Sequence, residues 1–467
     1  MIPTLLLILG LGSLSAATQD DAVEARLGEV ELNRLPGTEA FIHPAPTLDR
    51  AVLSYRLRTK ETYVLENGTA VADPVKFVGW KMPERKSVVL APPEAGAKSR
   101  RLFLGGEEVK DRGEIHDAEL LKEGTELALV ERKPDGMVLR VGDREVGPFE
   151  EIADLTEYRD LLVYSFRHEG RHRLQVGDRR FDLGGRPLYL YVSPDGSRVA
   201  WSEVVSQNTL RPVVEGKAGP ACDSLVAGIQ FSPNGRYATH VTREGVRYRG
   251  WVNGEEIKSE LSISAVRAFD DGSLAYAEMW SEPVKPAPKE PGAPTTSARG
   301  RLVVKGKREE RVLPRPVSAL ESQGESFYGA ARSDDRSVLV RIGPAGEVTY
   351  EEAKGRIDRV LLDPSGKRVL YSTKVKEGMF VQMGEQRLGP YAWADEFFHL
   401  QHTGQFGFVA AKADKVQLVV GGRAIPVALN EFAAPLRISK TELTIALAGT
   451  QRVKNKREVW VRVVPLE

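Results

Sequence analysis

The fold of this chain is decided by one stretch, Val192-Ser193-Pro194-Asp195-Gly196-Ser197-Arg198-Val199-Ala200-Trp201. It joins an apolar residue to a polar turn and then to a run rich in β-forming residues. In such a turn, proline presets φ at the second position, aspartate bonds nearby backbone, and glycine takes a positive φ. The run that follows is typical of a strand. The stretch therefore predicts a tight turn that leads into a buried strand.

The same pattern recurs along the chain at nearly constant spacing. Gly196, Gly235 and Gly272 end three such turns and lie 39 and 37 residues apart. A fourth clear copy is Leu362-Asp363-Pro364-Ser365-Gly366-Lys367-Arg368-Val369-Leu370-Tyr371. Together with weaker copies, turns are predicted near positions 50, 85, 124, 160, 196, 235, 272, 336, 366, 404 and 441. This spacing indicates about eleven repeats of about 38 residues.

A second turn signature keeps the same period. In most repeats a β-rich segment ends in a glycine turn, as at Gly142, Gly177, Gly216 and Gly254. A unit of this length with several short strands matches one four-stranded blade of a β-propeller. No long stretch shows the 3.6-residue periodicity of an amphipathic helix. The sequence therefore predicts an all-β protein, a β-propeller.

The clearest copies also resemble a known group of repeats. Ser193-Pro194-Asp195-Gly196, an apolar strand, and the strand end Val214-Glu215-Gly216 are similar to the WD40-like repeats of periplasmic propellers of the TolB type. The resemblance covers residues 190–280 and 355–425 best, and it concerns a repeat rather than a particular protein. It implies a binding platform in the bacterial cell envelope.

The arrangement of the repeats is open to two interpretations. Eleven repeats exceed the four to eight blades of an ordinary ring, so two propellers are predicted, over residues 18–235 and 236–467, with one large ring as the alternative. The β-rich run 458–464 is expected to complete a sheet begun near the N-terminus, which would remove exposed sheet edges. Residues 281–300 interrupt the rhythm with five prolines and are predicted to form an extended loop. This insertion is interpreted either as a partner-binding loop or as a tolerated surface insertion.

The first seventeen residues indicate export. They contain no charged side chain and hold the apolar run Leu5-Leu6-Leu7-Ile8-Leu9, followed by small residues up to Ala17. This pattern fits a signal peptide over residues 1–17, with a buried N-terminal strand as the alternative. The expected location is the periplasm or the extracellular space. No further segment reaches the apolar length of a membrane span, so no membrane span is predicted.

Composition narrows the expected partners and bonds. The 66 Lys and Arg residues nearly balance the 65 Asp and Glu residues. A nucleic-acid partner is not expected, because such binders normally carry an excess of basic residues on one face. Cys222 is the single cysteine, which excludes a disulfide within the chain.

The histidines that lie close together in the sequence, and could therefore share a functional site, form two pairs. His399 and His402 follow Asp395, but residues three apart on a strand face opposite sides and would converge on a metal only if the strand bulges or turns there. His168 and His172 flank Glu169-Gly170, which reads as a hairpin tip. No catalytic, cofactor-binding or metal-ligating residue is predicted, and no cofactor.

The sequence therefore favours a non-enzymatic binding or scaffold protein. Its expected partner is a protein, with a glycan as a further option. The alternative is a propeller-based hydrolase or lyase that acts on a glycan or peptide through a site assembled from several blades.

Overall fold

The computed structural model describes residues 23–31, 39–44, 51–56, 62–66, 69–72, 76–82, 86–91, 99–105, 107–109, 114–122, 124–158, 160–285, 295–309, 311–413, 415–432, 436–438, 444–453 and 456–466. Within these ranges the regular elements are all β-strands, and there is no α-helix. The strands form eleven antiparallel sheets, nine of four strands and two of five. The prediction of an all-β chain built from propeller-type repeats is confirmed. The number of repeats in a ring and the number of rings stay predictions.

No helix long and apolar enough to cross a membrane is found among the described residues. The predicted signal peptide, residues 1–17, lies outside them.

The chain divides into two compact units, Met1–Gly170 with Leu400–Glu467, and Arg171–His399. The predicted domain boundary at residue 235 stays a prediction. In the first unit, β1 pairs with β46, with Val23 opposite Val463, so the expected joining of the two chain ends in one sheet is confirmed. The strands of this unit are β1 (Val23–Glu31), β2 (Glu39–Pro44), β3 (Ala51–Arg56), β4 (Thr62–Glu66), β5 (Thr69–Ala72), β6 (Lys76–Lys81), β7 (Lys86–Ala91), β8 (Arg101–Leu104), β9 (Glu107–Glu108), β10 (Glu114–Leu121), β11 (Glu126–Lys133), β12 (Gly136–Val141), β13 (Arg144–Phe149), β14 (Glu151–Tyr158), β15 (Leu161–His168), β40 (Phe406–Lys412), β41 (Lys415–Val420), β42 (Arg423–Pro426), β43 (Glu431–Phe432), β44 (Arg437–Ile438), β45 (Thr444–Val453) and β46 (Lys456–Pro465).

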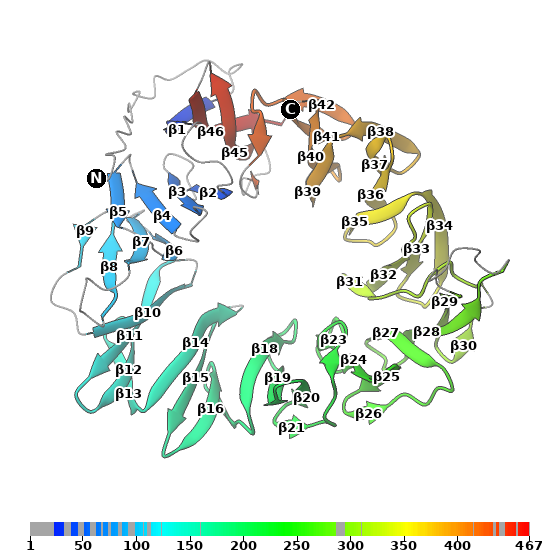
Figure 1. Cartoon of the computed structure of the whole chain (residues 1–467), viewed down its shortest axis with the longest axis horizontal. Helices are drawn as coiled ribbons and strands as arrows, with labels where there is room; N and C mark the ends of the chain where they lie inside the picture. The colour runs from blue at the N-terminus through cyan, green and yellow to red at the C-terminus, as the bar shows by residue number, and fades with distance from the viewer. Residues whose placement is uncertain are drawn as a thin grey trace. The chain divides into compact units, whose positions relative to one another are not determined.

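In the second unit the sheets β18–β21, β22–β26, β27–β30, β31–β34 and β35–β38 follow one another in chain order (Figure 1). The strands of this unit are β16 (Arg171–Val176), β17 (Arg179–Asp182), β18 (Arg186–Val192), β19 (Val199–Ser206), β20 (Thr209–Val214), β21 (Lys217–Ala218), β22 (Ser224–Leu225), β23 (Gln230–Phe231), β24 (Ala238–Glu244), β25 (Arg247–Val252), β26 (Glu255–Glu256), β27 (Ser262–Ala268), β28 (Leu274–Pro283), β29 (Thr296–Val304), β30 (Lys307–Arg308), β31 (Glu321–Gln323), β32 (Ser326–Ala331), β33 (Arg336–Ile342), β34 (Val348–Lys354), β35 (Arg356–Leu362), β36 (Val369–Val375), β37 (Gly378–Met383), β38 (Gln386–Tyr391) and β39 (Trp393–His399).

The repeated turns adopt the conformation that their sequence predicts. The N–H of Gly196 donates to the carbonyl oxygen of Ser193 at 2.9 Å, and Gly196 has φ +72°. The Asp195 carboxylate accepts from the backbone N–H of Ser197 at 3.1 Å. Turns 232–235, 269–272 and 363–366 close in the same way. Glycine is required at the last turn position because other residues rarely adopt that backbone conformation.

Turns of successive sheets also bind one another. The N–H of Asn234 donates to Oδ1 of Asp270 at 2.8 Å, and the Arg198 guanidinium donates to the carbonyl oxygen of Arg236. These contacts place the turns 193–198, 232–237 and 269–273 at a common end of their three sheets. We call it the turn end.

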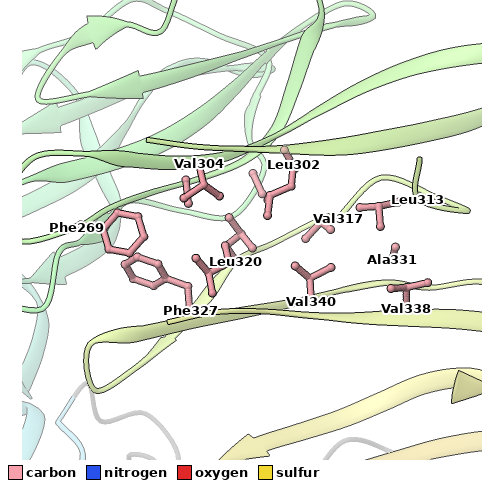
Figure 2. Packing of buried hydrophobic residues seen from close by; sticks show 14 residues of the cluster. Phe269, Leu302, Val304, Leu313, Val317, Leu320, Phe327, Ala331, Val338 and Val340 are labelled. Atoms are coloured by element: carbon pink, nitrogen blue, oxygen red, sulfur yellow. The ribbon is translucent and has the colours of Figure 1, made fainter. Parts of the chain in front are cut away.

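Apolar side chains between neighbouring sheets form the core. Figure 2 shows the core between β27–β30 and β31–β34, where the rings of Phe269 and Phe327 lie 4.9 Å apart and meet edge to face. Leu302 and Leu320 pack beside them and are at most 1% exposed. Burial of each such side chain stabilises the fold by about 1.5–3 kcal/mol. The sheets β27–β30 and β31–β34 therefore share one core, which neither could form alone.

The predicted loop over residues 281–300 is shorter than expected. β28 and β29 pair as far as Pro283 opposite Thr296, so both ends of that range are strand. The pairing is supported by Glu282, which accepts from Trp280 Nε1 at 2.9 Å and from Arg299 Nε at 3.3 Å. Residues 286–294 lie outside the described residues.

Candidate interaction surface

The other end of these sheets carries hairpins. β18 begins with Arg186 opposite Val204 and ends with Val192 opposite Val199. The turn 193–198 joins the end of β18 to the start of β19. Because the strands are antiparallel, the hairpin between β19 and β20 lies at the end opposite the turn. The hairpin between β24 and β25 has the same place in the next sheet. We call residues 186–189, 203–211, 222–226 and 243–248 the hairpin surface.

Large apolar side chains are exposed on this surface. The described residues include seven exposed large hydrophobic side chains, and five of them belong to it. They are Leu188 (44% exposed), Tyr189 (58%), Val205 (49%), Val226 (37%) and Val246 (94%). The remaining two, Val146 and Val312, lie on β13 and in the connection between β30 and β31. Apolar groups that gather on one face of a protein often mark an interaction site.

A β-bulge exposes two of these side chains at once. The register of β18 on β19 shifts between Pro187, opposite Glu203, and Tyr189, opposite Ser202. Leu188 is therefore the extra residue, and a bulge of this kind bends the strand and re-aims its side chains. As a result Leu188 and Tyr189 are both exposed, whereas a regular strand would turn one of them inward.

The segment 222–226 connects the two sheets of the surface. Cys222 exchanges two backbone hydrogen bonds of 2.8 Å with Leu210 of β20. Asp223 donates its N–H to the carbonyl oxygen of Arg243 at 2.9 Å, and its Oδ2 accepts from the N–H of Gly245 at 2.7 Å. Val226 follows directly and so lies on the segment that joins the two hairpins.

Most of the charged side chains at the surface that form no ion pair are basic. Arg186, Arg243 and Arg247 are exposed, and none of them forms an ion pair within the described part of the chain. Two of the acidic groups are paired, since Glu203 is buried against Arg211 at 2.8 Å and Glu244 binds Arg249 at 3.4 Å. The third, Asp223, is exposed and accepts from the N–H of Gly245. The hairpin surface therefore combines exposed apolar side chains with an excess of positive charge.

The two histidine pairs have different surroundings. His399 ends β39 and His402 lies in the following turn, while Asp395 pairs with Arg359 at 3.2 Å. No group of three or more His, Cys, Asp or Glu side chains suited to a metal occurs in the described ranges. Glu169 and Gly170 both have positive φ at a hairpin tip, as predicted.

Two tryptophans of these sheets belong to the core. Trp201 is fully buried and Trp251 is 9% exposed. The hairpin surface was not predicted from the sequence. Its signal is the run Leu188-Tyr189-Leu190-Tyr191-Val192 after Pro187, which has too many consecutive apolar residues for a regular strand with one buried face.

No protein-family model matches the chain, and no curated protein matches it. Among solved structures, it is similar to a eukaryotic initiation factor, with 9% identity over 74% of this chain and 94% of that chain and a TM-score of 0.33. It is also similar to the Dos1 propeller, with 10% identity over 75% and 92% of the chains and a TM-score of 0.32. A third is dipeptidyl peptidase 4 of Porphyromonas gingivalis, with 12% identity, 72% and 56% coverage and a TM-score of 0.34. These identities and TM-scores are too low to transfer an activity.

Proposed function

We propose that this chain is an exported, non-enzymatic binding protein that holds a protein partner on the hairpin surface. The observation that carries the proposal is the gathering of five exposed apolar side chains on two neighbouring sheets. Removing apolar area from water contributes about 25 cal/mol per Å². A partner that covers these side chains removes their apolar area from water, and this stabilises the complex relative to the separate proteins.

The partner's contact segment is apolar and carries acidic side chains. Arg186, Arg243 and Arg247 supply the charge that such a segment would meet. Complementary charge of this kind raises the rate of association and selects among partners more than it adds affinity. Export through the predicted signal peptide 1–17 places the contact in the periplasm or the extracellular space. The insertion 281–300 extends from the hairpin of the next sheet and is proposed as a second contact.

Site-specific photo-crosslinking tests the proposal. A photoreactive residue is placed at Tyr189 on the hairpin surface, or at the exposed Ser197 at the turn end as the matched position. The expected result is a discrete crosslinked protein from the producing cell at position 189 and none at 197. Identical products at both positions, or none at either, would contradict the proposal.

The captured protein is then purified and its affinity measured directly. A variant with Leu188→Ser, Tyr189→Ser and Val246→Ser should raise Kd at least tenfold, about 1.4 kcal/mol. Val146→Ser is the matched control, because it removes an exposed apolar side chain from the first unit. Deletion of residues 286–294 tests the second contact separately. Hydrolysis of glycans or peptides by the purified chain would instead favour the enzymatic alternative.

A further inference from the structure

Arg267 is a buried cation in an apolar interface. It lies on β27 and is 5% exposed. Ala265 and Phe269, two positions before and after it, both belong to the core between β27–β30 and β31–β34. The guanidinium therefore enters the space between two sheets rather than the solvent.

The guanidinium has almost no partner there. Within the described residues no carboxylate oxygen lies within 4.0 Å of its nitrogen atoms, and its buried Nε has no hydrogen-bond partner. Its one contact is between a terminal nitrogen and the carbonyl oxygen of the adjacent Val266, at 3.5 Å. A buried charge without a partner is strongly unfavourable, so an anionic group that accepts from this guanidinium would be bound favourably.

Three other sheets of the unit carry a neutral side chain at the position equivalent to Arg267. The residue two positions before the turn is Tyr191, Gln230 or Leu361 in three other sheets of the unit. Gln230 donates to the carbonyl oxygen of Ala227 at 3.0 Å. A guanidinium can only donate hydrogen bonds, so a buried arginine at this position needs acceptors around it.

The polar groups nearest to Arg267 do not supply a hydrogen-bond acceptor for its guanidinium. Glu321 on β31 is exposed and accepts from the Tyr328 hydroxyl at 2.8 Å. Burial lowers the pKa of the Arg267 guanidinium to about 9, so it is still charged at neutral pH.

We propose that Arg267 anchors a binding site for one small anionic group, a carboxylate or an inorganic anion, between β27 and the strands β31 and β32. A guanidinium offers parallel donors that match such groups in a bidentate manner. The site belongs to different sheets from the hairpin surface and lies next to the turn 269–272. It therefore does not depend on the proposed function.

Anion-dependent melting of the full mature chain tests this site. Wild type, Arg267→Met and Arg356→Met are compared in rising concentrations of sodium formate, sodium bromide or sodium phosphate. Arg356 is the matched control because it is an exposed arginine on β35, in a different sheet from β27, β31 and β32. A saturable rise in Tm is expected for wild type and Arg356→Met and is lost in Arg267→Met. An equal response of all three proteins would overturn the proposal.

Two further measurements keep the result decisive. Response to formate alone points to a ligand carboxylate, whereas response to bromide or phosphate points to a free inorganic anion. If Arg267→Met does not fold, Arg267→Lys keeps the charge but loses the bidentate geometry, and its anion affinity should fall about tenfold. If bromide raises the Tm, anomalous diffraction from a bromide-soaked crystal should show a peak beside Arg267, and a peak only elsewhere would reject the site.

Discussion

The turn end and the hairpin surface belong to the same sheets but use their side chains in opposite ways. At the turn end, polar side chains bind the backbone of their own turn or of the next one, as Asp195 and Asn234 do. At the hairpin surface, Leu188, Tyr189 and Val246 are exposed, and Arg243 has no ion pair within the described residues.

This difference separates residues that repeat from residues that do not. The Ser-Pro-Asp-Gly pattern recurs because each copy meets the same local need, the closure of a turn and its contact with the next. Closure of the turns does not require Tyr189 or Val246. Residues that follow the repeat are therefore expected to affect stability, and residues that depart from it are expected to affect binding.

The largest expected effect concerns His240, which lies on β24 between the two ends. Its ring stacks on Trp251 at 6.0 Å, and both ring nitrogens are buried without a hydrogen-bond partner. Burial lowers the pKa of His240 to about 4. Above pH 6.5 His240 is neutral in both the folded and the unfolded chain, so stability does not depend on its proton. As the pH falls from 6.5 toward 4, the unfolded chain binds a proton that the folded chain does not, and the free energy of unfolding decreases by about 3 kcal/mol in total.

Urea unfolding of wild type and His240→Phe between pH 7 and pH 4 measures this effect. The variant should be at least as stable at pH 7, because it removes two unsatisfied nitrogens, and should lose less stability in acid. Equal acid sensitivity of the two proteins would show that another group is responsible. Because acid unfolding affects both ends together, binding at the hairpin surface must be compared above pH 6.5.

A pair of glycines contrasts the two ends directly. Gly235 at the turn end has φ +77°, and a Cβ there would lie 2.7 Å from Oδ1 of Asp195. Gly245 at the hairpin surface has φ +58° with no atom within 4 Å of such a Cβ. Gly245→Ala should therefore cost only the left-handed backbone strain, about 1 kcal/mol, and Gly235→Ala about 2 kcal/mol or more. Thermal or urea unfolding measures the loss in the free energy of unfolding. Equal losses for Gly245→Ala and Gly235→Ala would contradict the difference between the two ends.

The sequence predicts the repeated part of the molecule well, because those interactions are local. Turn closure at Gly196 needs only residues within the same turn, so its conformation follows from residue types alone. The pairing of β1 with β46 was also predictable, since both are β-rich segments at the ends of a repeat array.

The candidate surface and the buried arginine were not predictable in the same way. The exposure of Leu188 depends on a bulge in the pairing of two strands, and the burial of Arg267 depends on a neighbouring sheet. The prolines of residues 281–300 predicted a loop throughout, but Pro283 ends a paired strand whose partner is thirteen positions away at Thr296. Such features arise from contacts that no single repeat contains.

Charge at the hairpin surface gives the next smaller effect. Replacing Arg186, Arg243 and Arg247 with glutamine should lower the association rate of the partner about tenfold at low salt, with little change in dissociation. The difference should shrink as salt rises, because exposed charges are screened. Arg236→Gln, at the turn end, is the control, and stopped-flow binding is the measurement. An equal loss of rate in the control would remove the distinction between the two ends.

The smallest effect is expected for Asp195→Asn. Hydrogen bonds from Ser193 and then Ser197 lower the pKa of Asp195 to about 2. The carboxylate therefore stabilises the fold above the ordinary pKa of 3.8, and this is lost as the pH falls toward 2. Asp195 is exposed, so solvent screening keeps the contribution below about 1 kcal/mol. Asn234 fills the same place in the next turn, where its Oδ1 accepts from the N–H of Arg236 at 3.0 Å, so an amide serves this position within the chain itself. Urea unfolding at pH 7 should therefore show a loss of a few tenths of a kcal/mol. A loss above 2 kcal/mol would mean that the turn end depends on the charge of Asp195. Electrostatics, rather than the geometry of its hydrogen bonds, would then stabilise the turn end.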